Sequence, residues 1–159
     1  MRPAPRFGAG LLPFLKVGGG TILLLLCSTT CGSSPETDPN AELREALGLD
    51  RNEELHRIVL GGQGRREHLV PTRLEIPQGA IVEIVTVDRR IHTVTFLADS
   101  LSPEAEAFLR ETSQMQSPPL LERGSRFVIS FREAPPGRYP FVSEGHGGTA
   151  SGIIVIGGT

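Results

Sequence analysis

The sequence predicts an all-β fold, an antiparallel Greek-key β-sandwich with a short helical insertion and an N-terminal helix. Two observations support it. Short runs rich in Val, Ile, Thr and Phe recur along the last two thirds of the chain, and Gly or Pro turn signals separate them about every eight to twelve residues. The strand–helix alternation that is typical of parallel sheets does not occur. We expect strands at 57–60, around Leu69, and at 72–76, 81–87, 91–96, 126–131, 139–142 and 152–156.

We divide the chain into an export segment (1–31), a tether with a short helix (32–54) and one folded domain (55–159). Arg2 and Arg6 precede an apolar run that is too short for a membrane span and that ends in small polar residues, as a signal peptide does. Ser, Pro, Thr and Asp dominate the tether, and a short helix over 41–47 follows, with a spacing or packing role.

Both cysteines, Cys27 and Cys31, lie at the end of the apolar run, so no disulfide is expected in the domain. A cysteine in this position resembles the lipidation site of bacterial lipoproteins. Our candidate for acylation is Cys31, which is followed by Gly32 and Ser33. Cys27 is interpreted as an ordinary residue of the apolar run. The expected location is the periplasm or the outer face of the cell envelope, with plain secretion and an uncleaved anchor as alternatives. The N-terminal anchor is the one membrane contact that we expect.

The charge argues against a nucleic-acid partner. Without residues 1–31 the chain loses three of its 16 Lys and Arg and none of its 18 Asp and Glu, so the formal net charge changes from −2 to −5. Nucleic-acid binding requires clustered Lys and Arg.

One helix is expected to interrupt the strands. Ser102 is a good N-cap, Pro103 suits the first helical position, and Glu104 is an acid in the first turn. We expect the helix to run to about Thr112 and to cover one end of the sandwich.

Two segments carry a family resemblance. In 91–96, His92 shares a strand face with Val94 and Phe96, so His92 should point inward if they do. In 139–155, Tyr139, His146 and Gly152 stand in the order strand, loop with histidine, glycine, strand. Together these segments resemble the copper-ligand regions of the cupredoxins, the small blue copper proteins such as plastocyanin and azurin. The resemblance covers about residues 70 to 156.

A blue copper site uses two histidines, a cysteine thiolate and a weak axial ligand such as methionine. The resemblance implies His92 and His146 as the histidine ligands. The cysteine position is Ser143 and the methionine position is Ala150. Because a serine alcohol stays protonated at neutral pH, we expect no blue colour, and the loss of the thiolate argues against electron transfer.

The two histidines predict a tetragonal nitrogen and oxygen site for Cu(II), or less favourably Zn(II), completed by water and Glu144. Such a site binds weakly unless a third protein ligand joins, and His56 and His68 are further sources. The predicted function is therefore that of an exported copper-binding protein, descended from blue copper electron carriers, with a non-blue site. The alternative is a metal-free interaction module with an unidentified protein partner in the envelope and an exposed apolar patch near the histidine end.

An enzyme is not expected. Ser143 and His146 are three residues apart, but the Gly-x-Ser-x-Gly motif of the hydrolases is absent, and so are a phosphate loop and an HExxH motif.

Overall fold

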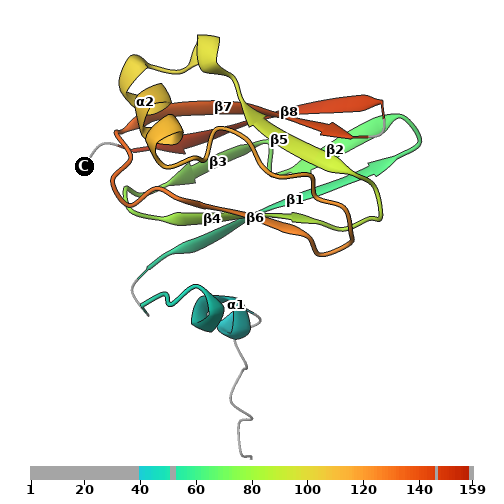
Figure 1. Ribbon diagram of the computed structural model, residues 1–159, viewed down its shortest axis with the longest axis horizontal. Helices are drawn as coiled ribbons and strands as arrows, with labels where there is room; N and C mark the ends of the chain where they lie inside the picture. The colour runs from blue at the N-terminus through green and yellow to red at the C-terminus, as the bar shows by residue number, and fades with distance from the viewer. Residues whose placement is uncertain (1–39, 51–52, 146, 158–159) are drawn as a thin grey trace, which may run out of the picture. The chain divides into compact units, whose positions relative to one another are not determined.

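Two sheets of four strands each lie face to face in the computed structural model (Figure 1), which describes residues 40–50, 53–145 and 147–157. The predicted export segment with Cys27 and Cys31, and the tether up to residue 39, lie outside the described residues. None of the helices among the described residues is long and apolar enough to span a membrane.

The first sheet has the strand order β2-β1-β4-β6 and the second the order β3-β8-β7-β5. The bounds of the strands are β1 Leu55–Gln63, β2 Arg66–Val70, β3 Arg73–Ile76, β4 Ile81–Thr86, β5 His92–Phe96, β6 Arg126–Ser130, β7 Gly137–Gly145 and β8 Gly148–Ile156. This arrangement confirms the predicted β-sandwich, in which β1, β2, β4 and β6 form one layer and β3, β5, β7 and β8 the other.

The pairing is mixed rather than wholly antiparallel. Among the described strands, β1 pairs with β4 and β3 with β8 in parallel, whereas the other four pairs are antiparallel. The parallel pairs arise because the chain crosses between the layers: β3 joins the second sheet before β4 returns to the first. A hydrophobic pattern read along the sequence does not reveal such a crossover.

The core lies between the sheets and is built from the inward face of each strand. On β5 the residues His92, Val94 and Phe96 are all at most 2% exposed, as the two-residue period predicted. The Tyr139 ring lies edge-on to Phe96 and to Phe131, the residue that follows β6, with ring centroids 6.5 and 5.2 Å apart. Edge-to-face pairs of this kind add to the stability that burial provides.

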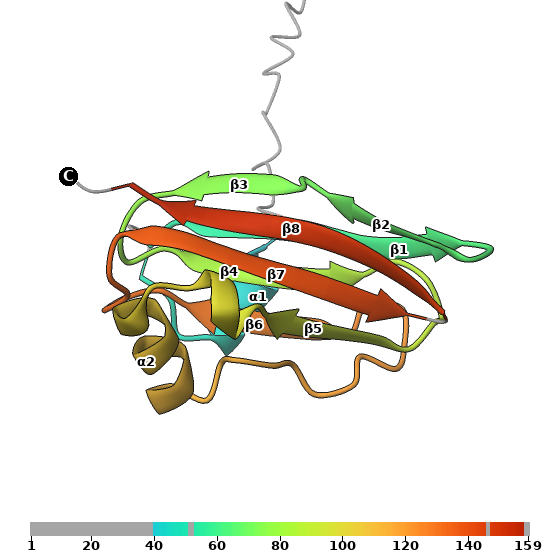
Figure 2. The same cartoon turned by 90° about the horizontal axis from the view of Figure 1, so that it is seen from above.

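The β7–β8 connection is tighter than expected. The sequence suggested a loop from about residue 143 to 151, but the antiparallel ladder continues to the pair Gly145 and Gly148. Only residues 146 and 147 join the two strands, and Gly147 has φ +80°, which a glycine adopts without strain. In Figure 2 the C-terminal end of β7 and helix α2 (Pro103–Glu111) lie at opposite ends of the second sheet.

Helix α2 confirms the predicted insertion. The Ser102 hydroxyl accepts a hydrogen bond from the backbone N–H of Ala105 at 3.2 Å, Pro103 occupies the first turn, and Leu109 is fully buried. After the helix, the chain runs along the free edge of β5. Backbone hydrogen bonds join Phe96 to Met115, Val94 to Ser117, and His92 to Leu120.

The outer face of the first sheet holds a buried charge. Glu83 of β4 has a side chain that is 0% exposed, and its carboxylate lies 2.6 Å from Arg57 Nε and 3.0 Å from Arg126 Nε. Arg57 also donates to the Asn40 side chain at the start of helix α1 (Ala41–Ala46). The short N-terminal helix therefore contacts the sheet through this charged group.

Candidate functional site

The candidate site is built around His92, the first residue of β5. Its backbone N–H and C=O both bond to Leu120, at 3.0 and 2.9 Å, and its register partner on the other side is Gly145 of β7. The strand is thus held on both sides, and the imidazole is directed into the space between the two sheets, where it is 0% exposed.

One ring nitrogen of His92 is held by Asp88. Its Nε2 lies 2.7 Å from Asp88 Oδ1, and Asp88 also accepts hydrogen bonds from the backbone N–H groups of Arg90 (3.0 Å) and Gly62 (2.7 Å). Burial raises the pKa of Asp88, but these hydrogen bonds and the nearby imidazole outweigh it and hold the pKa below its usual value of 3.8. Asp88 is therefore an ionised acceptor, and Nε2 carries the proton.

The other ring nitrogen faces Glu67. Nδ1 of His92 lies 3.2 Å from Glu67 Oε1, and both side chains are 0% exposed. The two atoms are nevertheless not aligned for a hydrogen bond: Nδ1 and both Glu67 carboxylate oxygens are buried without a hydrogen-bond partner. Burial raises the pKa of Glu67, and the nearby Asp88 charge adds to the effect, whereas His92 and Arg90 partly oppose it.

Glu67 belongs to the first sheet, yet it reaches the second. It lies on β2 opposite Gly62 of β1, with its side chain on the same inward face as Leu69. A side chain added at Gly145 would collide with the Glu67 carboxylate, and a side chain at Gly148 would meet the backbone carbonyl of Arg65. The two glycines of the hairpin therefore let β2 and its carboxylate approach His92.

Ser143 and Ala150, which stand at the cysteine and methionine positions of the resemblance, are register partners in the β7–β8 ladder. Ser143 is 0% exposed, and its hydroxyl is buried without a hydrogen-bond partner. Four residues earlier, Tyr139 donates from its hydroxyl to the Pro135 carbonyl at 2.6 Å, and burial raises its pKa to about 12. Tyr139 is thus a neutral structural residue.

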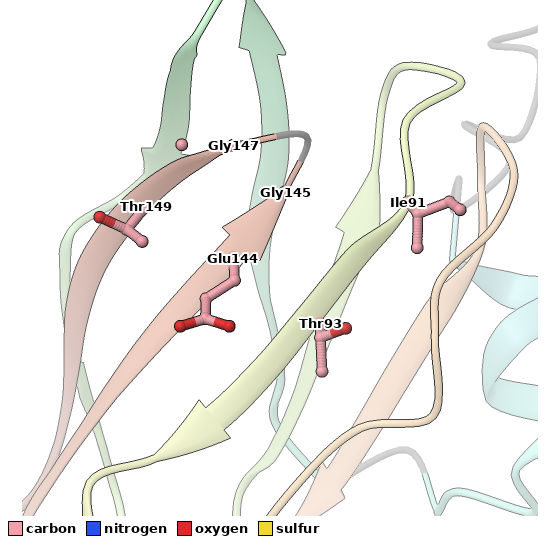
Figure 3. A pocket seen from close by; sticks show the side chains of 7 residues that line it. Ile91, Thr93, Glu144, Gly145, Gly147 and Thr149 are labelled. Atoms are coloured by element: carbon pink, nitrogen blue, oxygen red, sulfur yellow. The ribbon is translucent and has the colours of Figure 1, made fainter.

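Glu144 does not share a face with His92. It is exposed and forms a row across β5, β7 and β8 with its register partners Thr93 and Thr149. Figure 3 shows these three side chains on the outer face of the sheet, where they line a pocket with Ile91. A strand directs successive side chains to opposite faces, so Glu144 points away from Ser143 and from the buried imidazole.

Neither His56 nor His68 joins His92. His68 is exposed on β2, next to Glu67 but on the opposite face. His56 pairs with Glu54 at 3.1 Å near the start of β1, and the register places it six residues from Gly62, the partner of Glu67. Six residues of strand span about 20 Å.

His146 lies outside the described residues, directly after Gly145 in the sequence. Within the described part of the chain, no group of three or more His, Cys, Asp or Glu side chains is arranged to hold a metal ion.

The donor atoms present decide which kind of metal site fits. A thiolate site does not, because Ser143 offers an alcohol and the described residues contain no cysteine. A nitrogen and oxygen site fits better. A metal-bound histidine usually donates its other ring N–H to a carboxylate, which fixes the tautomer and directs the free lone pair at the metal. Asp88 is the carboxylate that accepts the hydrogen bond from Nε2 of His92, and Nδ1 is left without a hydrogen-bond partner.

Sequence reasoning missed both carboxylates. Glu67 was not among the predicted ligands, but it lies on β2, which begins at Arg66. The signal was present: Glu67 stands two residues before the buried Leu69, and therefore on the same strand face. Asp88 falls between the predicted strands 81–87 and 91–96, and its contact with the imidazole depends on how the connection between them folds back.

No protein-family model and no curated protein matches the chain. Solved structures do resemble it. A copper-containing nitrite reductase from Thermus scotoductus is 25% identical over 65% of this chain, with a TM-score of 0.48, and the match spans only 22% of the reductase.

Two smaller proteins match over nearly their whole length. A purple cupredoxin from Nitrosopumilus maritimus is 19% identical over 64% of this chain and 99% of its own, with a TM-score of 0.43. Plastocyanin from the fern Dryopteris crassirhizoma is 18% identical over 64% of this chain and 99% of its own, with a TM-score of 0.48. At this level the likeness concerns the fold and carries no function. The two four-stranded sheets of the chain themselves show the β-sandwich. The cupredoxin structures are similar to it over about two thirds of the chain.

Proposed function

We propose that the protein is an exported copper-binding protein of the cell envelope, and that His92 and His146 bind Cu(II) in a non-blue site. The observation that carries the proposal is the state of His92. Its Nε2 is held by an ionised Asp88 at 2.7 Å, while its Nδ1 is buried without a hydrogen-bond partner. An unsatisfied buried nitrogen costs free energy, and a metal ion would satisfy it.

His146 is the second ligand in this proposal. It follows Gly145, which is the register partner of His92 across β5 and β7. Imidazole nitrogens suit copper, nickel and zinc, and oxygen donors complete a tetragonal Cu(II) site. Bound copper would give the domain a metal centre at the end of the sandwich where β7 and β8 meet.

The test is metal uptake by the full chain in a Cys27→Ser/Cys31→Ser background, in which no thiol competes for copper. We expect about one Cu(II) per chain, with an absorption and electron paramagnetic resonance spectrum that is free of thiolate-to-copper bands. His92→Ala and His146→Ala should each abolish uptake, because each removes one of the two nitrogen ligands.

The exposed His68→Ala serves as the matched control and should bind copper as the parent does. If the His92 and His146 variants also bind like the parent, the site lies elsewhere in the chain and the proposal is wrong.

A second candidate function, a metal-free interaction module, is favoured by a separate observation. Ile91 is 58% exposed and Leu121 is 57% exposed. The hydrogen-bonded pair of His92 and Leu120 places these two residues opposite each other, so they form a small apolar patch beside the histidine end. Metal analysis separates the candidates, because the module predicts no stoichiometric uptake in protein purified without chelators.

A further inference from the structure

We propose that Glu67 is a metal ligand, and that its carboxylate and His92 Nδ1 bind one divalent cation between them. This inference rests on the proposed function and deepens it. It assigns a further protein ligand, an oxygen donor from β2 in the first sheet, to the site of His92, which lies on β5 in the second. The family resemblance did not point to this residue.

The first step is the protonation of His92. Asp88 accepts two backbone N–H groups in addition to Nε2, and a carboxylate in that role has no proton to donate. The proton therefore sits on Nε2. In the neutral imidazole, Nδ1 then carries a lone pair that faces the Glu67 carboxylate.

The second step is what lies between Nδ1 and Glu67. A lone pair and a carboxylate oxygen repel each other unless a proton or a cation stands between them. These two atoms are 3.2 Å apart, which is an ion-pair distance, but they are not aligned for a hydrogen bond. Two metal bonds of about 2.1 Å that meet at about 100° separate the two ligand atoms by about 3.2 Å. The observed separation matches that of two neighbouring ligands on one ion.

The third step is charge and space. Both Glu67 oxygens are buried without a hydrogen-bond donor, and a buried polar group without a partner costs free energy that a bound cation would recover. The pair packs closely against the hairpin, because a side chain at Gly145 would meet both the Glu67 carboxylate and His92 Nδ1. The absence of a side chain at Gly145 thus keeps two unsatisfied ligand atoms together.

The types of donor atom limit which metal ions can bind at this site. One imidazole nitrogen and one carboxylate oxygen suit Cu(II) and Zn(II), whereas Mg(II) and Ca(II) prefer sites made of oxygen alone. The carboxylate also gives the site the anionic ligand that Ser143 cannot supply, and this is the physical sense in which Glu67 replaces a thiolate.

The first experiment needs no substitution at the proposed site. The full chain in the Cys27→Ser/Cys31→Ser background is labelled with ¹⁵N-histidine and titrated with Zn(II), which is diamagnetic. We expect the His92 Nδ1 resonance to move to the position of a metal-bound nitrogen at about one equivalent, while Nε2 keeps its proton. If the His92 nitrogens do not change, the proposal is overturned, whatever the other histidines do.

The second experiment isolates Glu67. In Glu67→Gln the side chain keeps its shape but loses its charge, and we expect Zn(II) and Cu(II) to bind at least about tenfold more weakly. Glu144→Gln makes the same chemical change on the outer face of β7 and should bind like the parent. Circular dichroism and thermal unfolding in chelator check that both variants are folded.

The outcomes distinguish this inference from the proposed function. Loss of uptake in His92→Ala combined with unchanged affinity in Glu67→Gln would retain the histidine site and overturn the role of Glu67. Weaker binding in Glu67→Gln together with unchanged binding in His146→Ala would retain Glu67 and overturn the two-histidine site. A parent protein that takes up neither metal overturns both.

Discussion

Ser143→Cys, in the Cys27→Ser/Cys31→Ser background, is expected to turn a chain without thiolate-to-copper bands into one that shows a strong visible band with Cu(II). Ser143 is buried on the inner face of β7, and it is the diagonal neighbour of His92, because the register pairs are Val94 with Ser143 and His92 with Gly145. Diagonal neighbours lie about 7–8 Å apart at Cα, within reach of one metal ion for a sulfur and a ring nitrogen. A thiolate at this position would bind copper covalently.

The substitution should also be tolerated. The Ser143 hydroxyl is buried without a hydrogen-bond partner, which costs about 1–3 kcal/mol, and a thiol demands less of its surroundings. Ser143→Ala is the matched control, since it removes the hydroxyl but adds no sulfur and should remain without the band. A Ser143→Cys protein that takes up copper but shows no thiolate band would mean that position 143 does not border the metal.

The largest loss of stability is expected from Arg57→Met combined with Arg126→Met. Each substitution keeps an apolar stem of similar length but removes a cation from Glu83, whose side chain is 0% exposed. A buried carboxylate without a partner costs about 3–5 kcal/mol in the free energy of unfolding. Each single variant should lose much less, because the other arginine still pairs with Glu83.

Urea unfolding at neutral pH measures the effect, and a third substitution provides the control. Adding Glu83→Met to the double variant replaces the charge with an apolar side chain and should restore most of the lost stability. If the double variant instead unfolds like the parent, water or a proton satisfies Glu83, and the two arginines are ordinary surface residues.

Much of the fold was predictable because its local signals agree. The alternation of His92, Val94 and Phe96 placed the histidine inside, and Ser102 with Pro103 marked the start of helix α2. The two parallel pairings were not predictable, since the direction of β4 beside β1 depends on a crossover between the sheets. Neither was the contact of Asn40 with Arg57, which joins residues that are 17 positions apart through their side chains.

Only part of the candidate site could be predicted from the sequence. The spacing of family ligands placed His92, but it carries no information on what surrounds the ring. Asp88 is four residues from His92 and Glu67 is twenty-five residues from it, and both reach the imidazole only after the layers stack. For Glu144 the prediction of a ligand was wrong. Glu144 is next to Ser143 in the sequence, but the alternation of side chains along β7 places it on the outer face of the sheet.

The segment from Met115 to Leu120, which lies along β5, has a consequence for solubility. A strand at the edge of a sheet can pair with an edge strand of another molecule and so start aggregation. Hydrogen bonds from this segment already occupy the groups that β5 would offer at Phe96, Val94 and His92. A domain with no cysteine among its described residues, and so no disulfide there to staple it, is thereby protected from intermolecular pairing at the very strand that carries its buried histidine.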